Sequence, residues 1–417
     1  MEEVLVASID FGSKKISASL GRCGDEDIDI LGTAYATEKG MEKGLVKDKI
    51  KCMESLKSVI TKLETSTNEK ITDIYAGISS RNLRITEISA NINLTEGKVR
   101  AKDIRRAIER GRRNVTIADG EEIVDILINF YSLDEKVINE SIIGWKGNTL
   151  TLNLTVILGP TKELDKFREV ISGCGYNLKG FIVNIITGKE IFLNGKSAMG
   201  IKALVDIGGG TSDIAIFRNG IIKYIYSLPI GGNNITKDLS ICGKFSMGEA
   251  EKLKTIYSSN YETLFNENAD EDIIDVGTTK VSRTLFYEVA KARIEELLKY
   301  VNIELKNTSF FDGICSIIIY GDGIAYFENV SSVAREQIHK KTTIVTKDYL
   351  GMQNPANVTS LAIVKEVYDR LKLVYEDSTE VEIEKKIENE VVREILNEKK
   401  EREGILGKFR SFLEDIF

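Results

Sequence analysis

The chain has 417 residues, with 57 Lys or Arg against 64 Asp or Glu and a formal net charge of −7, which excludes the basic surplus expected of a nucleic-acid-binding protein. A single histidine, His339, and five scattered cysteines without CxxC spacing argue against a histidine zinc site, a Ser-His-Asp triad or a disulfide framework. We expect reduced, buried thiols, as in a cytoplasmic protein.

The N-terminus does not resemble a signal peptide, because Glu2 and Glu3 stand where a basic segment is required. No run of the ~20 apolar residues needed for a transmembrane helix is present. We therefore expect a cytoplasmic chain that contacts a bilayer only through its C-terminal end.

The first predicted element is a β-hairpin at 4–21. A predicted apolar strand ends near Asp10. Gly12 and Ser13 lie in the turn that follows, and a second apolar strand begins at about Lys15. Glycine lets a phosphate approach the backbone N–H groups, and a hydroxyl adds a donor. Lys15 is suited to neutralise a β- or γ-phosphate, and Asp10 to hold hydrated Mg²⁺.

The next segments alternate between strand and helix patterns, which favours an α/β fold. A strand is predicted at 27–37, a helix at 47–63 and a strand at 71–79. The segment 84–160 then has the order strand, helix, strand, strand, which predicts a small α+β module. Its basic helix at 101–114 presents either a solvated face or a surface for an acidic partner.

After this module we expect a helix at 161–175 and a strand at 180–186. The same region supplies Asn184, a candidate for positioning water. Because an amide is a poor general base, Asn184 predicts slow turnover.

The stretch 203–217 repeats the strand–turn–strand pattern of the first hairpin. A buried strand ends at Asp206, three glycines follow, and a second strand begins after a hydroxyl. Two such turns predict a phosphate chain gripped from both sides, with Asp206 as a second carboxylate for Mg²⁺. The residues concerned are Asp206, Gly208, Gly209, Gly210, Thr211 and Asp213.

Three later segments complete the predicted nucleotide-binding half. They are a glycine pair followed by two helices at 227–254, an amphipathic helix at 286–306, and a buried strand with a Gly-Asp-Gly turn within 313–330.

The end of the chain combines a charged segment at 376–403 with an amphipathic helix at 404–417. We expect a flexible tether and a helix lying in the membrane interface, with docking on protein as the alternative. The apolar face consists of Ile405, Leu406, Phe409, Phe412, Leu413, Ile416 and Phe417.

The two hairpins resemble the phosphate-1 and phosphate-2 motifs of the actin-like ATPase superfamily. Within it, the chain is similar along nearly its whole length to the FtsA family, bacterial cell-division proteins that attach FtsZ to the membrane. The resemblance implies an α/β, actin-like (ribonuclease H-like) two-domain fold that binds ATP and Mg²⁺.

The resemblance also implies a domain organisation. It places subdomain 1A at 1–83 and 161–200, 1C at 84–160, 2A at 201–228 and 306–357, and 2B at 229–305, followed by a helix at 358–375 returning to 1A, the linker 376–403 and the membrane helix 404–417.

Further nucleotide contacts follow from the resemblance. Arg293 and Glu296 are expected at the adenosine, with ion pairing on the helix surface as the alternative. The remaining implied contacts are Gly232, Gly321, Asp322 and Gly323, where Asp322 interrupts a run that is usually three glycines.

The implied function is a polymerising, ATP-dependent anchor, at most a slow ATPase, at the division site on the cytoplasmic face of the membrane. The expected partners are the FtsZ C-terminal peptide at 2B, further copies of the chain, anionic lipid at the tail, and other divisome proteins at 1C. The alternatives are a pilus or secretion adaptor and a sugar kinase or phosphatase of the same superfamily.

Overall fold

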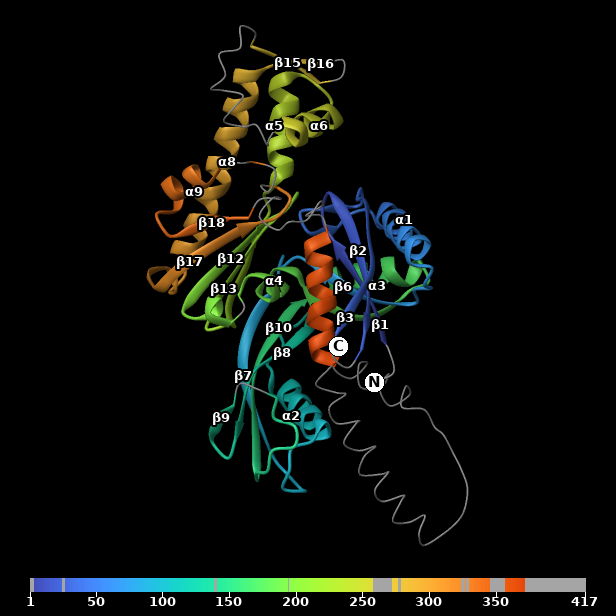
Figure 1. The fold of residues 1–417 in the computed structure, drawn as a ribbon, viewed down its shortest axis with the longest axis vertical. Coiled ribbons are helices and arrows are strands. Elements are labelled where there is room, and N and C mark those ends of the chain that lie inside the picture. The colour runs from blue at the N-terminus through green and yellow to red at the C-terminus, as the bar shows by residue number, and fades with distance from the viewer. Residues whose placement is uncertain are drawn as a thin grey trace.

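The computed structural model describes residues 4–24, 27–138, 141–193, 195–257, 272–276, 279–323, 327, 330–345 and 357–371. Within these residues it contains two five-stranded sheets, one four-stranded sheet and two short two-stranded sheets. The five-stranded sheets occupy the middle of the molecule, with the four-stranded sheet beyond one end and a group of helices beyond the other (Figure 1).

The first five-stranded sheet, called the first sheet, combines three antiparallel strands with two parallel ones. In spatial order its strands are β11 (Asn177–Val183), β6 (Asp73–Ile78), β1 (Val4–Phe11), β2 (Lys15–Cys23) and β3 (Ile28–Thr37). Helices α1 (Lys49–Thr67) and α3 (Thr161–Gly173) share one apolar core with this sheet, and a short β4–β5 hairpin (Met41–Glu42 and Leu45–Val46) precedes α1.

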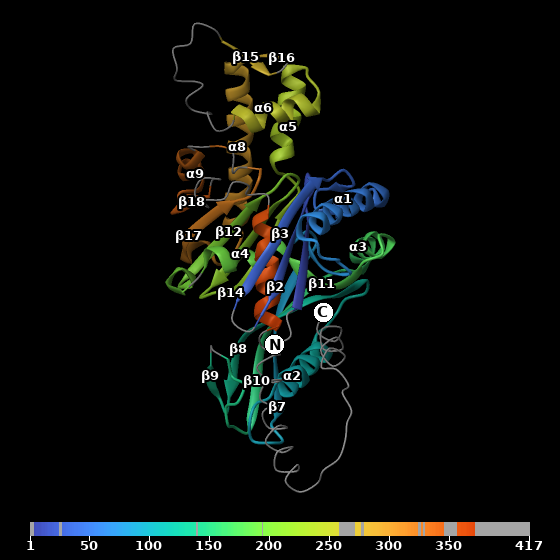
Figure 2. The same ribbon diagram turned by 45° about the vertical axis from the view of Figure 1, so that its right-hand side comes forward.

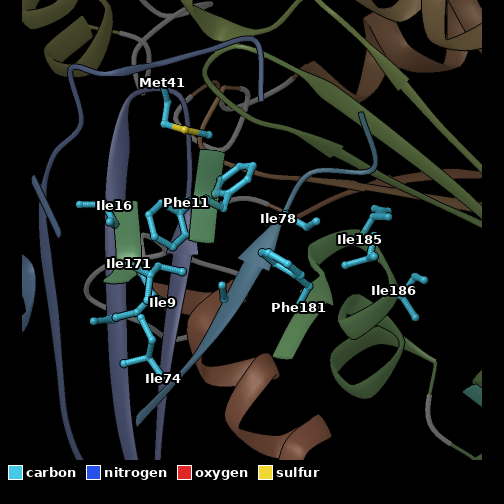
Figure 3. Packing of buried hydrophobic residues seen from close by; sticks show 14 of the residues in the cluster. Ile9, Phe11, Ile16, Met41, Ile74, Ile78, Ile171, Phe181, Ile185 and Ile186 are labelled. Carbon is cyan, nitrogen blue, oxygen red and sulfur yellow. The ribbon is translucent and has the colours of Figure 1, made fainter. Parts of the chain in front are cut away.

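Both faces of the first sheet are covered, which explains why β1 and β2 are buried along most of their length. Ile9 and Phe11 of β1 pack with Ile171 and Phe181 in the core shown in Figure 3. Val6 packs on the other face against a helix formed by residues 358–371, which runs along the sheet (Figure 2).

The other five-stranded sheet, called the second sheet, repeats the topology of the first. Its spatial order is β14 (Ile221–Leu228), β13 (Ser212–Arg218), β12 (Ile201–Ile207), β17 (Ile314–Tyr320) and β18 (Thr342–Ile344). Again three antiparallel strands continue into two parallel ones, and β12 occupies the place of β1. Between the sheets lies α4 (Asn184–Phe192), followed by a short turn at Gly195–Ala198.

The helical group at one end, here called the upper lobe, stands on the second sheet (Figure 1). It consists of α5 (Gly232–Gly243), α6 (Met247–Tyr257), the pair β15 (Ile273–Val276) and β16 (Thr279–Ser282), and α8 (Arg283–Lys306). The turn Phe311–Gly313 and α9 (Val330–Ile338) lie nearer the sheet. Ser282 caps α8 by accepting a hydrogen bond from the Leu285 N–H at 3.2 Å.

The four-stranded sheet and one helix form an inserted module with its own apolar core. Its strands, in spatial order, are β7 (Arg84–Asn93), β10 (Thr149–Pro160), β8 (Glu121–Leu133) and β9 (Lys136–Ile138), covered by α2 (Ala101–Asn114). The chain enters through β7 and leaves through β10, and these strands pair antiparallel with Arg84 opposite Leu158. Entry and exit therefore lie side by side, as an insertion requires.

Two expectations about local structure need correction. The strand expected at 180–186 ends at Val183, because Asn184 begins α4. The five cysteines are free, but Cys242 and Cys315 are exposed rather than buried. His339 is exposed, as expected, and no described helix is long and apolar enough to cross a membrane. The segments 376–403 and 404–417 lie outside the described residues.

The helix formed by 358–371 is joined to the inserted module by a buried charge cluster. Arg370 donates to both carboxylate oxygens of Asp125 on β8, at 2.8 Å each, and also pairs with Glu366 at 3.0 Å. Burial disfavours the charged form of Glu366, but neighbouring Lys189 and Arg370 outweigh it and lower its pKa to about 2. Burial also raises the pKa of Asp125, against the opposing effect of Arg370.

Replacement of Arg370 by Met is expected to destabilise the protein by about 3–5 kcal/mol, because Asp125 would remain buried without its counter-ion. Chemical denaturation measures this loss. Arg84→Met is the matched control, since Arg84 forms an exposed pair with Glu121 in the same module and its loss should cost less than about 1 kcal/mol. Equal effects of the two substitutions would contradict the prediction.

Candidate functional site

A pocket lies where the turns of the two sheets face each other. One wall is the β1–β2 turn, another is the β12–β13 turn, and Tyr320 at the end of β17 contributes a third side. Val358 and Thr359, at the start of the helix 358–371, line it as well. The predicted site residues that line it are Asp10, Gly12, Ser13, Lys15, Asn184, Asp206, Gly208, Gly209, Gly210, Thr211, Asp213, Gly321 and Asp322.

The β1–β2 turn is held in shape by its glycine and serine. A Cβ atom at Gly12 would lie 2.7 Å from the Lys15 carbonyl oxygen, so this position excludes a side chain. Ser13 accepts a hydrogen bond from the Gly44 N–H at 2.9 Å, which fastens the turn to the β4–β5 hairpin.

The β12–β13 turn is supported from behind by the first turn of α5. The N–H of Gly232 donates to the Gly208 carbonyl at 2.9 Å, and the N–H of Asn233 donates to that of Gly209 at 2.7 Å. Gly323 donates to the Ile207 carbonyl at 2.7 Å. Gly232 and Gly323 thus back the turn without lining the pocket.

Asp10 lies at the end of β1 and is held by Asn184. The Asn184 amide donates to the Asp10 carboxylate at 2.7 Å, while the Asn184 Oδ1 atom is buried with no hydrogen-bond partner in the structure. Burial raises the pKa of Asp10 to about 6, although Lys15 opposes this shift. Asn184 therefore positions the Asp10 carboxylate.

Asp206 and Asp213 face each other across the β12–β13 hairpin, where Asp213 is buried and Asp206 is half-buried. Asp213 accepts hydrogen bonds from Ser79 and Ser80 at 2.9 Å each, which connects the second sheet to the end of β6. Burial, followed by the charges of Asp213 and Asp10, raises the pKa of Asp206 well above its usual range.

The sequence analysis missed Ser79 and Ser80. Their position could have indicated them. Ser79 and Ser80 directly follow β6, which is parallel and adjacent to β1, and ligands of open α/β sheets bind at the carboxyl ends of such strands.

Two consecutive lysines of the first turn reach residues of the other half of the molecule. Lys15 forms an ion pair with Asp322, and Lys14 forms one with Glu251 of α6. Glu251 also accepts from Thr236 at 2.6 Å and pairs with the buried Lys254 at 3.0 Å. Burial lowers the pKa of Lys254 to about 8. Lys14 and Glu251 were not predicted as site residues, because their contact joins segments that are remote in sequence.

Arg293 and Glu296 are not among the residues that line this pocket. They pair with each other on α8, and the Arg293 Nε atom donates to Asp238 of α5 at 2.6 Å. These contacts correspond to the ion-pairing alternative, and an adenosine contact remains a prediction.

The chemistry of the pocket fits a nucleotide with a hydrated divalent cation. It offers bare glycine backbone, lysine and carboxylates. Among the described residues no group of three His, Cys, Asp or Glu is placed to hold a metal ion directly.

Replacement of Asp10 by Asn is expected to stabilise the protein at pH 7.5, measured without nucleotide or Mg²⁺. Because burial raises the folded-state pKa of Asp10 to about 6, the wild type loses stability as pH rises from about 4 to about 6. The variant escapes this loss of about 2–3 kcal/mol. Denaturation at pH 4 and pH 7.5 should show a gain only at the higher pH.

The control for this experiment is Asp165→Asn, which changes an exposed carboxylate of α3. Its effect should be small at both pH values. Destabilisation of the Asp10 variant at pH 7.5 would contradict the assignment of a buried, costly charge.

Comparison with known proteins identifies the family. Residues 203–362 match the family model of cell division protein FtsA, and residues 80–158 match that of the SHS2 domain inserted in FtsA. FtsA of Neisseria meningitidis serogroup B is 27% identical over 310 residues, covering 73% of this chain and 74% of that protein. FtsA of Bacillus subtilis is 24% identical over 370 residues, covering 87% and 83%.

Solved structures with similar folds agree with the predicted α/β, actin-like architecture. A chain of the PilM–PilN type IV pilus biogenesis complex has a TM-score of 0.58 at 11% identity, covering 89% of this chain and 99% of that one. MreB5 of Spiroplasma citri bound to AMPPNP has a TM-score of 0.51 at 14% identity, covering 90% and 98%. The two family models together span more than half of the sequence, and the chain belongs to the FtsA family of cell division proteins.

Proposed function

We propose that this chain is an ATP-binding, polymerising protein that anchors the FtsZ ring to the cytoplasmic membrane and recruits later divisome proteins. The observation that carries the proposal is the pocket between the two glycine-bearing turns, in a chain of the FtsA family. The alternatives of a pilus adaptor or a sugar kinase have no comparable support, since the PilM likeness is one of fold at 11% identity.

The nucleotide would be held from both sides of the pocket. The N–H groups of 208–210 and the Lys15 ammonium are the donors for phosphate, while Asp10 and Asp206 would contact Mg²⁺ through water. The cation supplies charge neutralisation between phosphate and carboxylates. Gly232, Gly321 and Gly323 would shape the adenosine side. MreB5 of Spiroplasma citri, which has a similar fold, is bound to AMPPNP.

We expect nucleotide to act as a conformational switch with slow turnover at most. The Asn184 Nδ2 atom donates to Asp10, and its buried Oδ1 atom has no hydrogen-bond partner in the structure. An amide oxygen accepts a hydrogen bond but does not remove a proton at neutral pH.

Replacement of Lys15 by Met is expected to weaken binding of Mg²⁺·ATP by about 10- to 100-fold. Loss of a charge-assisted hydrogen bond of about 1.5–3 kcal/mol gives this range. Isothermal titration calorimetry measures the change. Lys49→Met, which removes an exposed ammonium on α1, is the control and should bind as the wild type does. Unchanged affinity of the Lys15 variant would contradict the proposed phosphate contact.

Two surfaces distant from the pocket would serve the partners. In the upper lobe, proposed as subdomain 2B, Ile241 and Met247 expose apolar side chains on α5 and α6 and offer contacts for an FtsZ peptide. On the inserted module, proposed as 1C, Val137 and Trp145 are exposed and would suit another divisome protein or a further copy of the chain.

The proposed membrane contact lies in 404–417, outside the described residues, and rests on the sequence pattern. One amphipathic helix that folds on binding attaches weakly. A polymer would present many such helices, and linked contacts raise avidity by about 10²–10⁴ over a single site. Polymerisation and membrane attachment would therefore be coupled.

Deletion of 404–417 is expected to abolish co-sedimentation of FtsZ with anionic vesicles in the presence of Mg²⁺·ATP. The truncated chain should still capture an FtsZ tail peptide in solution, because the upper lobe is intact. Phe412→Ser should reproduce the loss of sedimentation, while Glu414→Ser, on the polar face, should not.

The two readouts separate the parts of the proposal. Vesicle binding that survives the deletion would contradict the membrane role of the tail. Failure of the full chain to capture the FtsZ peptide would contradict the anchoring function itself.

A further inference from the structure

Asp322 reaches into the pocket from the second sheet and forms an ion pair with Lys15 of the first turn. The two side chains are only 15% and 20% exposed, so the pair is largely shielded from solvent. Lys15 is the residue assigned above to phosphate. The lysine proposed to bind the nucleotide is thus already engaged by a carboxylate of the protein.

The backbone on either side of Asp322 is tightly constrained. Gly321 has a φ of +103°, and a Cβ atom there would lie 2.1 Å from the Asp206 carboxylate. A Cβ atom at Gly323 would lie 2.4 Å from the Gly208 carbonyl oxygen. Residue 322 is therefore the position in this turn that accommodates a side chain, and its neighbours fix where that side chain starts.

The other charges of the pocket have different partners. Asp213 is hydrogen-bonded by Ser79 and Ser80, Asp10 is hydrogen-bonded by Asn184, and Lys14 is paired with Glu251. A phosphate that binds Lys15 would have to break the ion pair between Lys15 and Asp322. A phosphate that takes Lys15 leaves Asp322 as an unneutralised carboxylate near Asp10 and Asp206, with which it interacts electrostatically.

We infer that Asp322 is a built-in competitor of the nucleotide: its carboxylate occupies Lys15 and ties the two sheets together in the nucleotide-free protein, and phosphate must displace it. This inference rests on the proposed nucleotide-binding function. Asp322 thereby sets the affinity for nucleotide and raises the requirement for a divalent cation, which neutralises the carboxylates once Lys15 has turned to phosphate.

The test compares Asp322→Asn with the wild type in ATP titrations, with Mg²⁺ and with EDTA. The amide keeps the shape of the side chain and removes its charge. Affinity should rise about fivefold with Mg²⁺, as expected for loss of a competing ion pair worth about 1 kcal/mol, and by a larger factor in EDTA. Glu69→Gln, which removes a half-buried carboxylate paired with Arg22, is the matched control and should leave both affinities unchanged.

A double-mutant cycle isolates the competition for Lys15. In the Lys15→Met background the gain from Asp322→Asn should shrink, because no pair remains to be broken. An equal gain in both backgrounds would overturn the competition for Lys15. Weaker Mg²⁺·ATP binding by Asp322→Asn would also overturn the inference. Asp322 would then support nucleotide binding, as a contact of the bound cation.

A measurement without nucleotide separates this inference from the proposed function. Hydrogen exchange at the amides of 12–15 and 207–211 should be faster in Asp322→Asn than in the wild type, because one tie across the pocket is lost. Unchanged hydrogen exchange at these amides would contradict the inference that Asp322 holds the two turns together. If neither protein binds ATP in any condition, the nucleotide-binding function fails, and the exchange data still decide whether Asp322 holds the turns together.

Discussion

Burial of carboxylates between two facing turns is the constraint on which the rest of this structure depends. Asp10 and Asp206 occupy equivalent places, each at the end of the first strand of a sheet and each followed by glycine within two residues. Burial in a polypeptide interior disfavours a charged carboxylate, and both pKa values are raised. A fold that keeps such groups there is less stable than it would be with neutral side chains, as is common at functional sites.

The two sheets meet through contacts of two kinds. Near α4 they share an apolar core, in which Ile185 and Ile186 belong to the same cluster as Leu204 and Phe217 of the second sheet. Around the pocket the contacts are polar: hydroxyls of 79–80 on Asp213, and lysines on carboxylates. Apolar packing has no substitute partner in water, whereas a polar contact can be exchanged for a ligand. The polar contacts around the pocket are therefore the ones that a ligand would exchange, while the apolar contacts near α4 would persist.

Local sequence pattern was enough to predict the hairpins, the glycine turns and the strands and helix of the segment 84–160. Each depends on features within a few residues: an apolar strand, a turn with glycine, or strict alternation. The boundary at Asn184 was missed because Ile185 and Ile186 suit a strand and a helix equally. The contact that places Asn184 beside Asp10 spans 174 residues of sequence, so no local pattern could indicate it.

Contacts between residues that are remote in sequence could not be predicted either, because local patterns do not show which distant segments meet. The partners Lys15–Asp322, Lys14–Glu251 and Ser80–Asp213 are each separated by more than one hundred residues. Charge alone suggested that Lys15 is available to phosphate, and the family resemblance implied that Arg293 contacts the adenosine. The fold shows Lys15 at the pocket but engaged by Asp322, and Arg293 engaged by Asp238 and Glu296.

The helix at 358–371 joins the pocket to the inserted module. Val358 and Thr359 line the pocket at its start, and Ser360 is hydrogen-bonded to Ser8 and Ser19 of the first sheet. Near its end Arg370 holds Asp125 of the inserted module. At 1.5 Å per residue the helix spans about 20 Å as one stiff element. The proposed tether and membrane helix follow this end of the helix in sequence. One helix therefore connects the pocket to the segment proposed to bind the membrane.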